Sequence, residues 1–259
     1  MIPPPSSNFS APMDKKTATA AILLIGDEIL SGKVEDENAR YLVHELRRAG
    51  VAVGRIEIVP DQLDVIAESV RRLSAGFEWV FSSGGVGPTH DDVTLAAVAA
   101  AFDRPTARSG ELEALMRRTW GENIHLRDLR MADIPLGARL EHGPRGPSAS
   151  WPVVVMQNVW ILPGVPKIFR RKFEAIRELF QGPPIHGRAV YSAEPEGVIA
   201  DTLDAVVAAF PTVAIGSYPH LDALDYRVKI TLDGRDARAV DAATDRLVGS
   251  LGAAVVRTE

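Results

Sequence analysis

The residues best suited to chemistry lie between positions 84 and 94, where the sequence reads GGVGPTHDDVT. The preceding residues 78–82 predict a buried strand, and the alanine-rich residues 92–102 predict a helix. Glycine lets backbone N–H groups approach a ligand without obstruction by a Cβ atom, and a helix start offers further donors to an anion. The segment therefore predicts a phosphate-binding loop with the candidate contacts Ser83, Gly84, Gly85, Gly87 and Thr89. Ser83 could equally satisfy backbone groups at the strand end.

Two adjacent carboxylates, Asp91 and Asp92, end this loop. They would repel a phosphate unless a cation lay between them. A divalent ion such as Mg²⁺ binds carboxylate and phosphate oxygens together, so the pair indicates a metal-dependent phosphoanhydride site. The alternative is that one of them merely caps the following helix.

Other polar or turn residues follow further predicted strands, at the sheet edge where open α/β sheets bind their ligands. Asp27 and Glu28 could ligate a metal or form a solvated turn, and Asp61 could cap the helix that follows it. The Pro-Gly turn before residue 167 could bind phosphate or serve as an ordinary helix entry. The added candidates are Gly26, Asp27, Glu28, Asp61, Pro163 and Gly164.

Strands and helices alternate through the first two thirds of the chain. Continuous apolar runs such as residues 18–25 are typical of strands covered on both faces, and helical spacing of apolar residues follows at 36–49 and 62–73. This order predicts a doubly wound, mostly parallel α/β sheet. Residues 181–184, which contain Gly and Pro, then mark a domain boundary. After them the predicted elements follow the order β-α-β-β-α-β, which is that of a ferredoxin-like unit. We expect a tail at 1–17 that is disordered, a main domain at 18–182 and a small α/β domain at 188–259.

Composition narrows the function classes. The 259-residue chain has a net charge of -5, no cysteine and 46% hydrophobic residues. The acidic balance argues against a nucleic-acid partner, and no apolar run is long enough to predict a membrane span. The absence of cysteine excludes thiolate metal sites and disulfides and fits a cytoplasmic location.

The segment GGVGPTHDDVT resembles the signature of the molybdopterin-binding (MoaB/Mog-type) domain. It is most similar to the branch found in the competence/damage-inducible protein A family and in the molybdopterin-binding-like domain of FAD synthases. Residues 26–32, Asp36 and Asn38 resemble the first loop of this family. Residues 59–61 and 162–166 resemble two further loops, and residues 217–219 and 226–233 resemble the accessory domain of that branch.

The resemblance implies that Asp61 and Asp92 are the catalytic acidic residues. It implies a pyrophosphatase that acts on a dinucleotide such as ADP-ribose or FAD, with Asp91 and Asp92 holding Mg²⁺, or Mn²⁺ or Co²⁺. Alternatives are molybdopterin binding or adenylylation in cofactor assembly, and a non-catalytic binding module. The last is favoured by residues 143–151, which read GPRGPSASW where the family usually has Asn-Pro-x-Gly-Thr-Ala-Pro-Gly. The resemblance also implies a homo-oligomer, either a dimer or a trimer.

Overall fold

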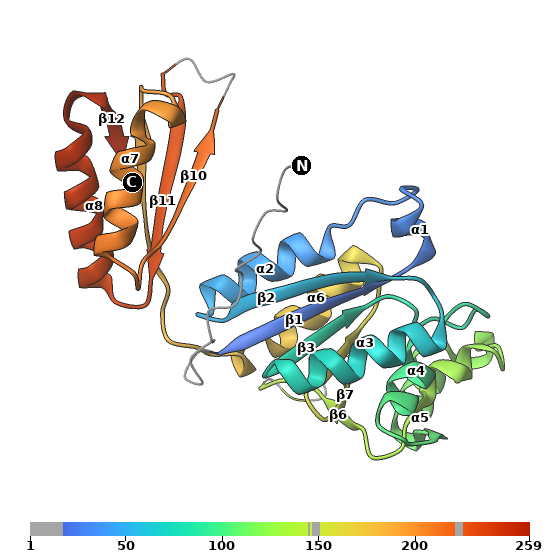
Figure 1. Ribbon diagram of the computed structural model, residues 1–259. Coiled ribbons are helices and arrows are strands. Elements are labelled where there is room, and N and C mark those ends of the chain that lie inside the picture. The colour runs from blue at the N-terminus through green and yellow to red at the C-terminus, as the bar shows by residue number, and fades with distance from the viewer. Residues whose placement is uncertain (1–17, 145, 147–150, 221–224) are drawn as a thin grey trace. The chain divides into compact units, whose positions relative to one another are not determined.

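The computed structural model describes residues 18–144, 146, 151–220 and 225–259 (Figure 1). The expected tail at 1–17 lies outside this part of the chain. So do residues 147–150, which belong to the segment that differs from the usual sequence of the family. The chain divides into a larger unit that ends at Gly182 and a smaller unit, Pro183–Glu259. We describe each unit by itself.

The larger unit is built on a six-stranded sheet of order β2-β1-β3-β8-β7-β6. Strands β2, β1, β3 and β8 are parallel, and β7 is antiparallel to both of its neighbours. This confirms the expected mostly parallel α/β sheet. The strands are β1 (Thr19–Ile25), β2 (Ala52–Val59), β3 (Trp79–Ser83), β6 (Arg139–Glu141), β7 (Val153–Met156) and β8 (Val159–Leu162).

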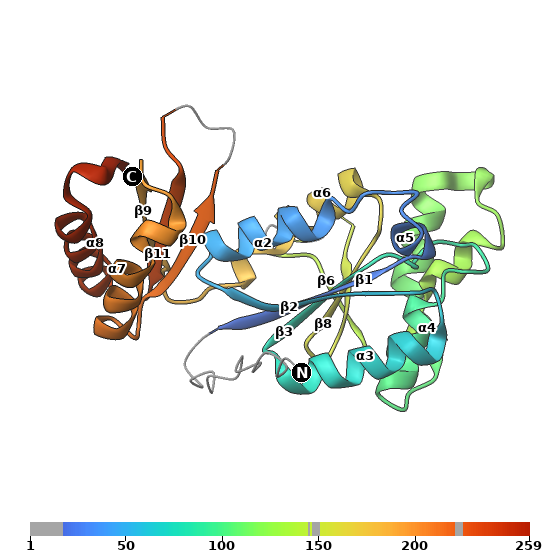
Figure 2. The ribbon, with the colours of Figure 1, turned by 45° about the horizontal axis from the view of Figure 1, so that its top comes forward.

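Helices cover both faces of this sheet, as Figure 2 shows for α2 and α6 on one side and α3 on the other. Their bounds are α1 (Asp27–Leu30), α2 (Asn38–Arg48), α3 (Leu63–Gly76), α4 (Thr94–Ala101), α5 (Gly110–Trp120) and α6 (Pro166–Ile176). Every residue of β1 is buried. Its alternate side chains enter two separate cores, one with residues of α3, α4 and α5 and the other with residues of α2 and α6. An uninterrupted apolar run is the sequence pattern that such a central strand requires.

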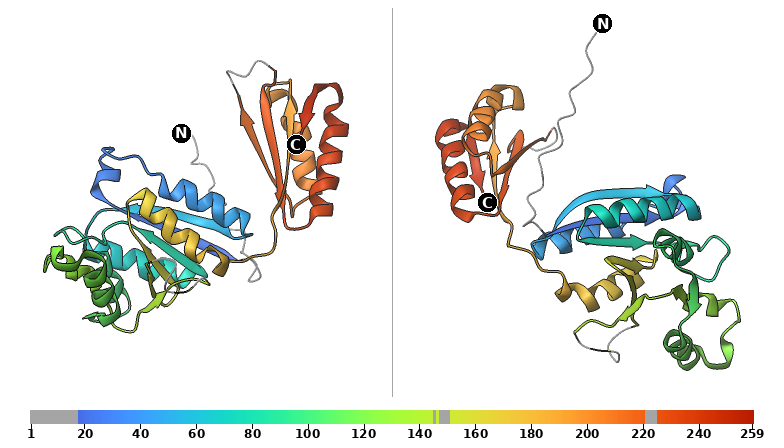
Figure 3. Two further views of the ribbon diagram at one scale, coloured as in Figure 1. Left: turned by 180° about the vertical axis from the view of Figure 1, so that it is seen from behind. Right: turned by 60° about the horizontal axis from the view of Figure 1, so that its bottom comes forward.

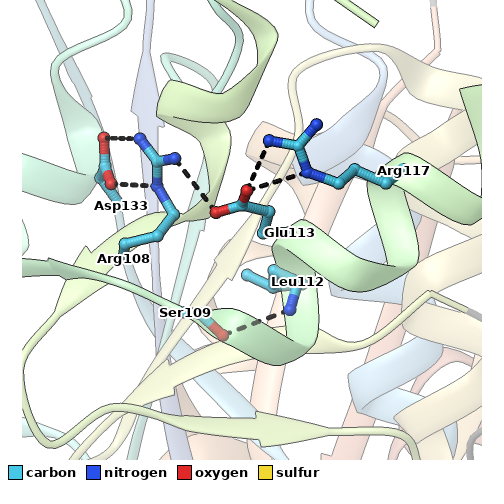
Figure 4. Close-up of polar contacts among 6 residues, drawn as sticks. All are labelled: Arg108, Ser109, Leu112, Glu113, Arg117 and Asp133. Atoms are coloured by element: carbon cyan, nitrogen blue, oxygen red, sulfur yellow. Dashed lines mark hydrogen bonds and ion pairs between the residues drawn. The ribbon is translucent and has the colours of Figure 1, made fainter. Parts of the chain in front are cut away.

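A small two-stranded sheet, β4 (Thr106–Arg108) and β5 (Asp133–Pro135), adjoins helix α5. Arg108 binds Asp133 at 2.6 Å and Glu113 at 3.3 Å, and Glu113 also binds Arg117 (Figure 4). Ser109 caps α5 by accepting a hydrogen bond from the N–H of Leu112. These exposed ion pairs fix the start of α5 but add little stability individually.

The smaller unit is a four-stranded antiparallel sheet of order β10-β11-β9-β12. If β9, β10, β11 and β12 are numbered 1 to 4 in chain order, their spatial order is 4-1-3-2, as expected of a ferredoxin-like fold. Helices α7 and α8 lie on one face of the sheet (Figure 3). The bounds are β9 (His186–Ser192), α7 (Glu196–Ala209), β10 (Ala214–Pro219), β11 (Val228–Gly234), α8 (Ala237–Leu251) and β12 (Val255–Thr258).

Candidate functional site

The glycine loop turns sharply at the end of β3. Gly84 has a φ of 112°, in the region that favours glycine. A Cβ atom there would lie less than 3.0 Å from the carbonyl oxygen of Ile25. The N–H of Gly84 donates to the carbonyl of Leu162 at 3.2 Å. Gly84 therefore brings the ends of β1, β3 and β8 together, and no larger residue fits.

Thr94, the first residue of α4, closes the loop from the other side. Its hydroxyl donates to the carbonyl of Gly84 at 2.9 Å, and its N–H donates to the carbonyl of Gly85 at 3.0 Å. Both carbonyls are thereby turned toward α4. Within the described residues the N–H groups of Gly85 and Val86 have no acceptor in the protein, so they remain available to a ligand.

The second half of the loop is organised by Asp92. One of its carboxylate oxygens accepts the N–H of Gly87 at 2.6 Å, and the other accepts the N–H of Thr89 at 2.8 Å. The hydroxyl of Thr89 also lies within hydrogen-bond distance of Asp92 and of Asp91. Asp92 thus holds residues 87–89 in their turn. The hydrogen bond from Thr89 lowers the pKa of Asp91, which stays exposed and charged.

Asp61 faces the first half of the loop. Its Oδ2 accepts the N–H of Asp27 at 2.9 Å, and its Oδ1 lies 3.5 Å from where a Cβ of Gly85 would be. Burial raises the pKa of Asp61, the Asp27 N–H opposes this, and the charges of Glu28, Asp27 and Asp91 raise the pKa further. Carboxylates that follow the ends of β1 and β3 therefore act on Asp61 across this corner.

Asn38 joins two of the predicted loops. The sequence indicated no specific role for its side chain. Its side-chain amide donates to Ser83 Oγ at 3.0 Å and to the carbonyl of Gly164 at 2.7 Å. Asn38 is 4% exposed. A Cβ on Gly164 would lie 3.3 Å from the Cα of Gly84, so the two glycine turns touch. Pairing a buried Asn at a helix start with a strand-end Ser requires the tertiary fold, which sequence spacing does not reveal.

The structure brings most of the predicted site residues to one corner. Asp27 and Gly26 meet Asp61 and the end of β2. Asn38 links Ser83 to Gly164, and the Ser83 hydroxyl donates to the carbonyl of Pro163. Glu28 is exposed and acts on Asp61 through its charge. In the turn that contains Gly87, Thr89, Asp91 and Asp92, the hydrogen bonds mainly join residues of the turn to one another.

Across the described residues, no three His, Cys, Asp or Glu side chains are grouped to hold an ion. Mg²⁺, however, is commonly held by only one or two carboxylates together with substrate phosphates. Burial is the main cause of the raised pKa of Asp61, and the charges of Glu28, Asp27 and Asp91 add a repulsion that such a cation would relieve. The corner therefore fits an ion that arrives with a phosphorylated substrate.

Comparisons with known proteins agree with this fold and loop. Residues 21–181 match the family described as "Probable molybdopterin binding domain", and residues 184–259 match "FAD synthase, middle domain". A protein of Archaeoglobus fulgidus is 35% identical over 222 residues, which cover 86% of this chain and 93% of the archaeal one. A probable FAD synthase of Caenorhabditis elegans is 32% identical over 267 residues, covering 92% of this chain and 51% of the relative.

Among solved structures, the crystal structure of CinA from Thermoplasma acidophilum is 30% identical with a TM-score of 0.57. The match covers 64% of this chain and 99% of that one. The chain spans about half the length of the FAD synthases that it matches. Over the described residues, no helix has both the length and the apolar character to cross a membrane. The chain belongs to the molybdopterin-binding domain family, and its smaller unit resembles the middle domain of FAD synthases.

Proposed function

We propose that the larger unit is a divalent-metal-dependent hydrolase that cleaves the pyrophosphate bond of a dinucleotide such as ADP-ribose or FAD. The observation that carries the proposal is the set of unused N–H groups at two touching turns. Within the described residues, the N–H groups of Gly85, Val86 and Gly164 have no acceptor in the protein, and the turns lie next to each other. Convergent N–H donors favour a phosphate.

The negative charge at this corner determines which phosphate ligand fits. The charges of Asp27, Glu28 and Asp91 all act on Asp61, so a bare phosphate would be repelled. A phosphate that carries Mg²⁺, Mn²⁺ or Co²⁺ is attracted instead. When bound, the ion would neutralise the negative charge of the phosphate oxygens and polarise the phosphorus. Asp91 is the exposed carboxylate that would hold it, with Asp92 fixing the turn that carries Asp91.

Asp61 is the proposed general base. Its Oδ1 faces Gly85, whereas Oδ2 is held by the N–H of Asp27. A carboxylate whose pKa is raised is a better proton acceptor than an ordinary one. In the proposed step, Asp61 takes a proton from water as the water oxygen bonds to one phosphorus. The P–O bond to the bridging oxygen breaks, and two monophosphates leave.

The relatives favour a dinucleotide as the substrate class, because those named FAD synthases match over nearly this whole chain. The matching family name favours a second candidate, which is the phosphate of molybdopterin held by the same N–H groups. A non-catalytic binding module is the third. A cytoplasmic location and self-association stay predictions.

The test is release of AMP from ADP-ribose and FAD, measured by chromatography with Mg²⁺, Mn²⁺ or Co²⁺. We expect metal-dependent release that is lost in Asp61→Asn and reduced in Asp92→Ala. Asp64→Asn is the matched control, because Asp64 is an exposed carboxylate in the first turn of α3. No release with any metal would contradict hydrolysis, and tight binding without release would support the non-catalytic module.

A further inference from the structure

Among the described residues of the smaller unit, helices α7 and α8 cover one face of the sheet. The side chains of Val190, Val228, Ile230 and Leu232 form a core with residues of α7 and α8, and Figures 1 and 3 show both helices on that face. Because successive side chains of a strand point to opposite faces, the intervening residues face away from the helices. We call this the open face of the smaller unit.

One row of residues crosses the open face in register. Tyr218 of β10 lies opposite Lys229 of β11, Lys229 lies opposite Tyr191 of β9, and Tyr191 lies opposite Arg257 of β12. Directly opposite residues share a face of the sheet. The row therefore alternates an aromatic ring with a cation across all four strands.

The Tyr191 ring is already packed with the cations on both sides of it in the row. The guanidinium of Arg257 lies 4.0 Å from the centre of the Tyr191 ring, and the ammonium of Lys229 lies 5.5 Å from it. Tyr191 is only 4% exposed and donates its hydroxyl to Glu259. Arg257 is paired with Asp225 and Glu259, whereas Lys229 makes no ion pair with a described carboxylate. Within this row, Lys229 is therefore the cation that can pair with a negatively charged ligand.

Tyr218 at the edge presents a free ring surface. A Cβ on Gly216 would lie 2.9 Å from the Tyr218 hydroxyl and 3.1 Å from Cε2. The outer end of the ring therefore lies over Gly216. Tyr218 is 55% exposed. An exposed tyrosine ring on a sheet is a surface on which a planar heterocycle stacks.

We propose that the open face of the smaller unit binds a nucleotide, with its base stacked on Tyr218 and its phosphate paired with Lys229. Tyr218 and Lys229 lie on neighbouring strands, about 5 Å apart in backbone spacing. A single nucleotide fits this pairing. A long single-stranded nucleic acid fits less well, because the chain carries a net charge of -5 and such polymers bind basic grooves. The proposal assigns this site to the smaller unit by itself and does not require hydrolysis there.

The probe is FMN, whose fluorescence is quenched when its ring stacks on tyrosine. We expect the full-length protein to quench FMN saturably, and Tyr218→Ala to weaken binding about tenfold or more. Tyr218→Phe keeps the ring and should bind like the parent. Lys229→Gln should weaken FMN but leave riboflavin, which lacks the phosphate, unchanged. Far-UV circular dichroism of each variant checks that the unit is folded.

Gly85→Ala, in the glycine loop, separates the two sites. The proposal predicts that this variant still quenches FMN as the parent does, whatever its effect on hydrolysis. Loss of quenching in Gly85→Ala with full quenching in Tyr218→Ala would place the flavin in the larger unit and overturn the proposal. Absence of saturable quenching in the parent, or equal quenching by all variants, would also overturn it.

Discussion

Replacing Asn38 tests whether the two glycine turns are held together as described. The Asn38 amide donates to Ser83 Oγ and to the Gly164 carbonyl, each bond contributing about 1 kcal/mol. Truncation to Ala also leaves a small cavity, at about 1 kcal/mol. Against this, Asn38 Oδ1 is buried without a partner, and its removal returns about 1 kcal/mol. Asn38→Ala should therefore lower the free energy of unfolding by about 2 kcal/mol.

Asn38→Asp is nearly isosteric but should be worse at neutral pH. A carboxylate cannot donate to the Gly164 carbonyl, and burying it unpaired costs more than removing the group. Its position at the start of α2 restores only about 0.3–1 kcal/mol through the helix dipole. Burial raises the pKa of the introduced carboxyl, so the neutral form is favoured in the folded state. The deficit should be full at neutral pH and shrink as pH falls through that raised pKa.

Urea unfolding followed by tryptophan fluorescence measures these effects in the larger unit alone. All four tryptophans, at positions 79, 120, 151 and 160, lie in that unit. Asn38→Asp as stable as the parent at pH 7, or a deficit that does not change between pH 7 and pH 4, would refute the reasoning. Asn38→Ala without any loss would show that the two bonds do not hold the turns.

Three further outcomes follow from the same corner. Asp61→Asn should raise the free energy of unfolding above pH 4, because a carboxyl whose pKa is raised in the folded state destabilises the protein once it ionises. The gain should vanish in acid, and urea unfolding at several pH values measures both effects. Gly84→Ala should destabilise by more than about 2 kcal/mol, since its Cβ meets a backbone oxygen, which the melting temperature reports. Thr94→Val should weaken ADP-ribose binding by freeing the Gly84 carbonyl, measurable by titration calorimetry.

Much of the fold was predictable because its strands carry clear patterns. The fully buried β1 reads as an apolar run, and β11 alternates, with buried Val228, Ile230 and Leu232. The short strands β4 to β6 were not predicted. Each has three residues, too few for a periodic signal. One of them, β6, nevertheless extends the main sheet.

The candidate site was predictable in its composition but not in its bonding. Glycines and aspartates at strand ends indicated the corner, since parallel strands end at one edge. The sequence did not indicate that both Asp92 oxygens bind the loop itself, nor that the pKa of Asp61 is raised. Both depend on which atoms of distant segments meet. The role of Asn38 likewise appears only when α2, β3 and the Gly164 turn are in place.

The most direct test of the central claim is calorimetric titration of the parent and Gly85→Ala with ADP-ribose and Mg²⁺. A Cβ on Gly85 would collide with the Thr94 hydroxyl, at a φ of 63° that disfavours alanine. The account predicts saturable, metal-dependent binding by the parent and loss of at least tenfold in affinity for a folded Gly85→Ala variant. Binding that is equal in the two proteins, or absent from the parent, would contradict the assignment of residues 84–87 as the phosphate-binding loop.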